Sequence, residues 1–212
     1  MQNKNFLVTI TGPSLTGKTT LANLLENEGF VEVVSTTTRP MRKGEINGKH
    51  YNFVTREQFK EMQNSGLMIE EVEVNGNFYG VSRPAVESIL KQGKNATVVV
   101  EPHGAQQVGD YCKLNNIPVF KVFLDNPVEL LISRFKQRYA NDDKADETTY
   151  KNRLWTMTMV EPKEWIEPAY NGQHYYDKVF SEFTPEIQDK VIFELLAEIS
   201  KKSDNKHKQR LR

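Results

Sequence analysis

The most informative segment of the 212-residue chain covers residues 12–19, which read GPSLTGKT. It fits the phosphate-binding pattern of a glycine, four variable residues and a Gly-Lys-Thr ending. It lies between an apolar, β-branched run, residues 6–11, and a stretch with leucines at helical spacing, residues 19–27. Glycines in such a turn let backbone N–H groups converge on phosphate oxygens, and the start of the helix adds positive potential. The segment therefore predicts a binding site for a nucleoside triphosphate.

Side chains of this loop add a positive charge and oxygen ligands. Lys18 supplies a charge for the donor phosphates, and the hydroxyl of Thr19 suits Mg²⁺, which prefers oxygen ligands. The residues expected to bind ATP are Gly12, Ser14, Thr16, Gly17, Lys18, Thr19 and Thr20, with Thr19 also as the metal ligand. The loop by itself does not identify the group that receives the phosphate.

Two arginines that could bind a second phosphate lie in residues 35–45, which read STTTRPMRKGE. Arg39 and Arg42 are three positions apart, and their planar guanidinium groups can clamp one phosphate with directed N–H donors. Tyr51 and Tyr79 could add hydroxyl donors. Joining two phosphate-bearing anions requires their repulsion to be neutralised, so this cluster predicts an acceptor site.

A second basic cluster follows later in the chain. Arg134 and Arg138 are four positions apart on one predicted helix face, and Arg153 follows an acidic stretch, residues 140–147. Phosphoryl transfer spreads negative charge over equatorial oxygens, and arginines on a mobile lid, residues 134–153, could stabilise that charge and exclude water. With Lys18 and Arg39, these three arginines are the candidate catalytic residues. The alternative is a surface basic face paired with nearby aspartates.

The elements that must position these residues alternate between strand and helix. Strands are expected at residues 6–11, 31–35, 96–101, 119–124 and 178–180, and helices at 19–27, 84–92, 104–115, 128–139 and 185–200. The pattern predicts an α/β fold, a P-loop parallel sheet flanked by helices. Residues 43–84 instead hold short strand-like pieces around one helix, residues 57–64, which indicates an inserted β-rich lobe.

The expected domain organisation follows from these patterns. Residues 1–36 and 84–202 form the kinase core, residues 37–83 form the lobe that binds the acceptor nucleotide, and residues 203–212 form a disordered basic tail.

The chain has 28 Lys and Arg against 28 Asp and Glu, so no net charge favours nucleic acid or an anionic membrane as a partner. A single cysteine, no secretory signal and no 20-residue apolar run indicate a cytoplasmic protein. Monomer and homodimer remain open alternatives, because the sequence carries no signal for the oligomeric state.

Several short segments resemble guanylate kinases. Besides residues 37–45, they are NGKHYNFV at 47–54, Ile69-Glu70, Tyr79-Gly80 and GAQQ at 104–107, in the order found in that family, and the resemblance covers about residues 5–200. It implies ATP with Mg²⁺ as donor and a nucleoside monophosphate as acceptor. It also implies that Glu70 accepts hydrogen bonds from guanine N1 and N2, and that the acceptor phosphate is held by Ser35, Arg39, Arg42, Tyr51 and Tyr79. Arg134, Arg138 and Arg153 resemble the lid arginines of the family.

Two positions depart from the family pattern near the base. Val81 follows Tyr79-Gly80 where the family commonly has serine or threonine, and Glu101 is the only acid left of a strand end that usually carries two. Both are included among the acceptor-binding residues.

The expected reaction is phosphorylation of GMP or dGMP to GDP or dGDP. The alternative is a kinase for another or modified deoxynucleoside monophosphate. A non-catalytic binding module is less favoured because Lys18 and Thr19 complete the loop.

Overall fold

The computed structural model describes residues 5–74, 76–140, 147–171 and 176–210. Its strands are β1 (Leu7–Thr11), β2 (Phe30–Glu32), β3 (Thr36–Thr37), β4 (Asn52–Phe53), β5 (Met68–Val74), β6 (Asn77–Ser82), β7 (Asn95–Val99), β8 (Val119–Leu124) and β9 (Lys178–Phe180). Its α-helices are α1 (Lys18–Asn27), α2 (Arg56–Asn64), α3 (Arg83–Lys91), α4 (Pro102–Leu114), α5 (Val128–Ala140), α6 (Glu147–Trp155), α7 (Glu167–Tyr170) and α8 (Gln188–Arg210). Two π-helical turns, η1 (Thr156–Val160) and η2 (Pro162–Ile166), and a 3₁₀ turn, η3 (Pro185–Ile187), complete the described elements.

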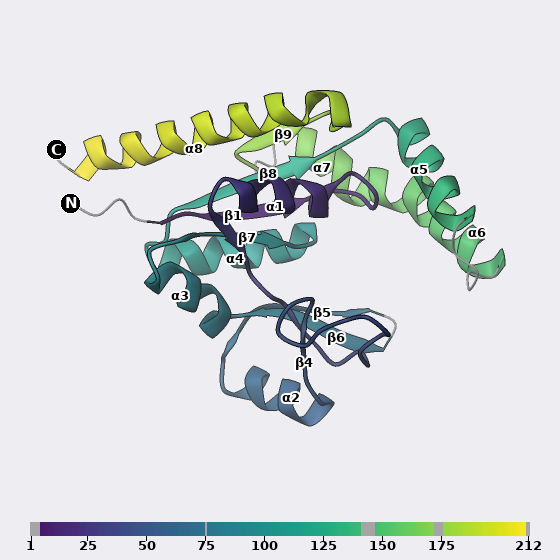
Figure 1. The fold of residues 1–212 in the computed structure, drawn as a ribbon, viewed down its shortest axis with the longest axis horizontal. Helices are drawn as coiled ribbons and strands as arrows, with labels where there is room; N and C mark the ends of the chain where they lie inside the picture. Colours follow the sequence, from purple (N-terminus) through teal and green to yellow (C-terminus); the bar gives the residue numbers. More distant parts are fainter. Residues whose placement is uncertain (1–4, 75, 141–146, 172–175, 211–212) are drawn as a thin grey trace. The chain divides into compact units, whose positions relative to one another are not determined.

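The larger sheet has the strand order β2-β7-β1-β8-β9, flanked by helices (Figure 1). The pairs β2–β7 and β8–β9 are parallel. All residues of β1 are buried, as expected for a strand covered on both faces. This confirms the predicted α/β fold with a parallel sheet.

The chain divides into two compact units, and β1 and α1 contribute residues to both. The first unit comprises Met1–Thr9 and Leu25–Val119, and the second comprises Ile10–Leu24 and Phe120–Arg212. The predicted acceptor lobe, residues 37–83, falls within the first unit. The phosphate loop and the predicted lid, residues 134–153, fall within the second.

The first unit contains a second, smaller sheet with the strand order β4-β3-β6-β5. Strands β5 and β6 pair antiparallel, and a register shift between Met68 and Glu70 interrupts the ladder. A shift of this kind redirects a side chain relative to a regular strand. Helix α2 packs on this sheet through Phe59, whose ring stacks on Phe78 at a centroid distance of 5.5 Å. A capping box between Thr55 and Gln58 fixes the start of α2.

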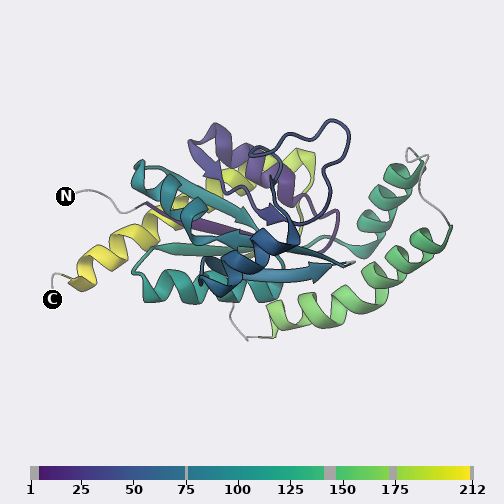
Figure 2. The same cartoon turned by 90° about the horizontal axis from the view of Figure 1, so that it is seen from below.

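The second unit contains a long helical stretch that the sequence did not predict. α6, η1, η2 and α7 follow one another from Glu147 to Tyr170 with no break in helical backbone. α5 and α6 lie side by side in both views (Figures 1 and 2). Leu131 and Phe135 of α5 pack with Met157 of η1 in a buried apolar cluster. Of the acidic stretch expected to be mobile, residues 141–146 lie outside the described part of the chain.

Helix α8 is longer than the sequence predicted. It runs to Arg210, through most of the segment expected to be a disordered tail, while residues 211–212 lie outside the described part. Val191 and Leu195 anchor its first half in the core, because both are almost fully buried. Of the helices described, none combines the length and the apolar composition that crossing a bilayer requires.

Candidate active site

The phosphate loop joins the end of β1 to the start of α1 in the second unit. Gly12 and Gly17 have φ angles of 148° and 102°, which side chains rarely tolerate. A Cβ at Gly12 would lie 2.1 Å from the carbonyl oxygen of Leu124, and one at Gly17 would lie 2.6 Å from the ring of Phe183. Both glycines are therefore required by backbone conformation and by close packing.

The side chains of the loop have different environments. Lys18 Nζ donates to the carbonyl oxygens of Gly12 and Pro13, each at 2.7 Å. Thr16 is fully buried and its hydroxyl donates to the Pro13 carbonyl at 2.9 Å, so it braces the loop from within. Thr19 and Thr20 are exposed in the first turn of α1, where their hydroxyls can reach a ligand.

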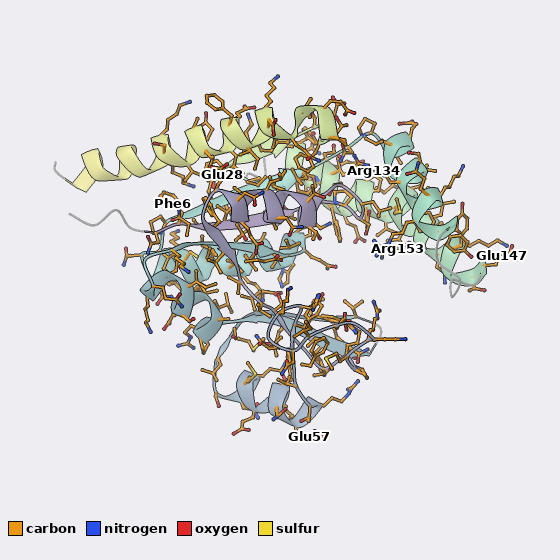
Figure 3. The ribbon with its side chains drawn as sticks, in the orientation of Figure 1. Phe6, Glu28, Glu57, Arg134, Glu147 and Arg153 are labelled. Atoms are coloured by element: carbon orange, nitrogen blue, oxygen red, sulfur yellow. The ribbon has the colours of Figure 1, made fainter. Side chains whose placement is uncertain are left out.

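Two of the three predicted lid arginines contact the phosphate loop. Arg134 donates to the carbonyl oxygens of Leu15 at 2.9 Å and Phe183 at 3.0 Å. Arg153 donates to Ser14 Oγ at 2.7 Å. Figure 3 shows Arg134 on α5 and Arg153 on α6. Arg138, one turn beyond Arg134, is exposed in the last turn of α5.

Sequence reasoning missed two residues that bind this loop. Asn126 is buried; its amide donates to the Thr16 carbonyl at 3.0 Å, and its amide oxygen accepts from the Phe183 N–H at 2.9 Å. Glu161 is 2% exposed and accepts from Ser14, through the backbone N–H at 3.3 Å and the hydroxyl at 3.2 Å. Both residues lie more than 100 positions from the loop along the chain, so no local sequence pattern could predict that they contact it.

In the first unit, Arg39 is bound by a carboxylate that the sequence had not singled out. Its two terminal nitrogens donate to Glu45 at 3.0 and 2.7 Å, and the backbone N–H of Arg42 donates to the same carboxylate at 2.7 Å. These hydrogen bonds, chiefly that from Arg39, lower the pKa of Glu45 to about 2. The side chain of Arg42 is exposed. The spacing of Arg39 and Glu45 within one segment is the signal that could have revealed the pair.

Aromatic rings complete the surroundings of Arg39. Its guanidinium carbon lies 5.5 Å from the ring centroids of both Tyr51 and Phe53. Tyr51 and Tyr79 meet edge to face at 5.9 Å. The structure thus brings together Arg39, Tyr51 and Tyr79, as the sequence predicted. Ser35, half-buried, precedes β3, and its carbonyl accepts from the Asn52 N–H at 2.8 Å.

Glu70 is the buried carboxylate of the first unit. It follows the register shift in β5, is 8% exposed, and accepts a hydrogen bond from the Val81 backbone N–H. Burial, together with the negative charge of Glu101, raises the pKa of Glu70 to about 7. A Cβ at Gly104 would lie 3.0 Å from Glu70 Oε2, so the glycine leaves room for the carboxylate.

The two departures from the family pattern flank Glu70. Val81 pairs with Glu70 in the β5–β6 register and is fully buried, and the neighbouring Ser82 is 6% exposed. Glu101, the N-cap residue of α4, is exposed. The surroundings of Glu70 are therefore more apolar on the Val81 side and more negative on the Glu101 side.

The phosphate loop offers an oxygen ligand of the type that suits a Mg²⁺ ion bound together with a nucleotide. Within the described residues, no cluster of three or more His, Cys, Asp or Glu could hold a metal ion. Mg²⁺ in nucleotide sites takes most of its ligands from phosphates and water, so it needs few protein ligands. The exposed hydroxyl of Thr19, directly after Lys18, is of the required type.

A family model, curated relatives and a solved structure point to the same family. The guanylate kinase family model matches residues 4–161. Guanylate kinase of Mesorhizobium japonicum is 34% identical over 154 residues, which cover 72% of this chain and 70% of the relative. Guanylate kinase of Anaplasma phagocytophilum is 33% identical over 169 residues, covering 78% and 80%. The crystal structure of a guanylate kinase from A. phagocytophilum is similar with a TM-score of 0.62 and 30% identity, covering 93% of this chain and 88% of that chain.

Proposed function

The chain belongs to the guanylate kinase family, and we propose that it transfers the γ-phosphoryl group of ATP to GMP or dGMP, giving ADP and GDP or dGDP. The buried carboxylate of Glu70 determines which base the acceptor site prefers. It offers two oxygen acceptors to the N1–H and N2–H donors of guanine. Adenine presents an acceptor at N1 and would meet the carboxylate unfavourably.

The acceptor phosphate is bound by the cluster around Arg39. Tyr51 and Tyr79 lie beside its guanidinium and offer hydroxyl donors, and the exposed Arg42 and the hydroxyl of Ser35 complete the set. Glu45 holds Arg39 through both terminal nitrogens and so limits the directions in which the guanidinium can point. A pre-oriented arginine loses less conformational entropy when it binds phosphate.

The donor phosphates are bound by the N–H groups of the phosphate loop, by Lys18 and by the lid arginines Arg134, Arg138 and Arg153. An oxygen of the acceptor phosphate attacks the γ-phosphorus, and the bond from that phosphorus to the oxygen bridging to the β-phosphate breaks, which releases ADP. No general base is needed, because a phosphate monoester with a second pKa of about 6 is already ionised at neutral pH. Thr19 would hold Mg²⁺, which when bound neutralises charge on the phosphate oxygens.

A substrate panel tests the assignment. ATP-dependent phosphorylation is measured for GMP, dGMP, AMP, CMP, UMP and dTMP under identical conditions, by coupled detection of ADP. The guanine nucleotides should have the highest kcat/KM. Pyrimidine nucleotides with a kcat/KM clearly above those of GMP and dGMP would overturn the assignment of guanine as the preferred base and leave the kinase assignment standing. No turnover with any acceptor would overturn the kinase assignment.

A kinase for another or modified deoxynucleoside monophosphate is the second candidate, and Val81 is the observation that favours it. Val81 is fully buried beside Glu70 and supplies no hydroxyl to a base. A site without that hydroxyl discriminates less strongly for guanine O6. Modified deoxynucleotides added to the panel separate the two candidates.

A further inference from the structure

The carboxylate of Glu161 is buried against the phosphate loop, where an anionic ligand is expected. Its two oxygens accept from the backbone N–H and the hydroxyl of Ser14, at 3.3 and 3.2 Å. Backbone N–H groups of such a loop are the donors that bind phosphate oxygens. A protein carboxylate therefore holds one of the donors that the triphosphate of ATP would use.

The Ser14 hydroxyl connects Glu161 to a lid arginine. It donates to Glu161 Oε1 and accepts from Arg153 at 2.7 Å, so it uses both of its hydrogen-bonding functions. Arg153 itself is exposed, while Glu161 is 2% exposed. Release of Glu161 from Ser14 would thus alter the contact of Arg153 with the loop as well.

The backbone around Glu161 is unusual in a way that supports a functional position. The π-helical turns η1 and η2 lie directly before and after it, and π-turns are rare and concentrate at functional sites. Pro162 has no N–H donor, and its ring crowds the preceding turn of an α-helix, which accounts for the wider turns. Each extra residue in a turn rotates the following side chains by about 100° relative to a regular α-helix.

The same helical stretch also packs against the tip of the phosphate loop. Leu15, with a φ of 67°, packs against the cluster of Leu131, Phe135 and Met157. The loop and the segment that carries Glu161 are therefore joined by an apolar contact and by a hydrogen-bonded carboxylate.

We propose that Glu161 competes with the donor triphosphate for the Ser14 N–H, so that ATP binding displaces Glu161 and moves the helical segment that carries it. This inference rests on the proposed binding of ATP at the phosphate loop. Two anions within a few ångströms of one donor repel each other, and a single N–H makes a full hydrogen bond to only one acceptor. Glu161 thereby weakens ATP binding and couples the position of the lid to the donor site.

Calorimetric titration with ATP, without acceptor, tests the competition. Glu161→Gln keeps the size of the side chain and removes its charge. It should lower the Kd for ATP by about three- to tenfold, because a neutral amide oxygen competes for the Ser14 N–H less strongly than a carboxylate does. Glu164→Gln is the matched control, because Glu164 is exposed on the same stretch, and its Kd should stay within twofold of wild type. Lys18→Ala should weaken binding.

The direction of the change separates competition from damage. Structural damage at Glu161 would weaken ATP binding, so an unchanged or raised Kd in Glu161→Gln, with ATP still bound by wild type and bound more weakly by Lys18→Ala, would overturn this inference alone. A wild type that binds no ATP would overturn the proposed donor site and the inference with it. Glu161→Ala provides a second variant, expected to change Kd in the same direction.

Tryptophan fluorescence tests the displacement itself. The chain has two tryptophans, Trp155 in α6 and Trp165 in η2, and they flank Glu161. Saturating ATP should change the emission of the wild type, and Glu161→Gln should reach the same end point at lower ATP concentration. An emission spectrum that stays constant while calorimetry reports saturation would overturn the displacement.

Discussion

Arg134 of the second unit and Arg39 of the first unit are held by different kinds of acceptor. In the second unit, Arg134 donates to two neutral carbonyl oxygens, those of Leu15 and Phe183. In the first unit, Arg39 is bound through both terminal nitrogens to the carboxylate of Glu45, with side chains 11% and 18% exposed.

The difference matters because carbonyls and carboxylates affect a cation differently. A carbonyl orients a guanidinium without cancelling its charge, whereas a carboxylate at 2.7 Å fixes the orientation of the guanidinium more tightly and offsets part of its charge. We expect donor-side cations to act mainly on the transition state and Arg39 to act mainly on acceptor binding. The following substitutions test this division, from the largest expected effect to the smallest.

Lys18→Ala should lower kcat by about 10²–10³-fold, because it removes a charge from the donor phosphates where negative charge develops. Steady-state kinetics measure the loss, and a thermal melt checks the fold. Lys136→Ala removes an exposed lysine of α5 and serves as the control, with kcat expected within twofold of wild type. A Lys18→Ala enzyme with normal turnover would refute the assignment of the phosphate loop.

Arg39→Ala should raise the KM for the acceptor by about 10- to 100-fold and leave the Kd for ATP unchanged, since a charge-assisted hydrogen bond is worth about 1.5–3 kcal/mol. Glu45→Gln should raise the acceptor KM less, by about threefold, because Arg39 remains but loses part of its orientation. Calorimetry with each substrate separates the effects. Equal weakening of ATP and acceptor in Arg39→Ala would indicate a damaged fold.

Acceptor binding should depend on pH through Glu70. The pKa of Glu70 is raised to about 7 by burial and by Glu101, and guanine requires its carboxylate form. The affinity for GMP should therefore rise about tenfold from pH 6 to pH 8 as Glu70 ionises. Glu70→Gln should bind GMP more weakly and retain only the pH dependence of the acceptor phosphate. Identical pH profiles for wild type and Glu70→Gln would contradict this expectation.

The stability of the protein should depend on pH in the opposite direction. The pKa of Glu70 in the fold lies above its ordinary value of 4.5, so the folded state favours the protonated carboxyl. Its contribution to stability is fully present below about pH 4.5 and is lost as pH rises through about 7. The Tm of wild type should fall between pH 5 and 8 relative to that of Glu70→Gln, as measured by calorimetric scans without nucleotide.

The smallest effect is expected at Val81. Val81→Ser supplies a hydroxyl beside Glu70 and should leave the kcat/KM for GMP unchanged or improve it by up to about threefold. The Tm should fall, because a fully buried apolar side chain is replaced by a smaller polar one. A large loss of GMP activity with a normal Tm would argue that the valine itself contacts the acceptor.

Much of the fold was predictable because its elements have strong local patterns. Strand β8 and strand β9 have the bounds that the sequence predicted. Helix α1 begins one residue earlier than predicted, and α3 begins and ends one residue earlier. The helical stretch from Glu147 to Tyr170 was not predicted. Pro162 and Pro168 interrupt the usual helical signal, and the stretch is held instead by packing of Tyr150, Leu154 and Met157 on α5.

The sequence by itself determined the chemistry that depends on neighbours along the chain. The phosphate loop needs only two glycines, a lysine and a threonine within residues 12–19, and the Arg39 segment likewise combines its groups within a few residues. Only the tertiary structure decided which distant residues contact the phosphate loop. Glu161 lies 147 residues from Ser14 and Arg134 lies 119 residues from Leu15, so only packing brings them together. The raised pKa of Glu70 has the same origin, because burial and the nearby charge of Glu101 are properties of the fold.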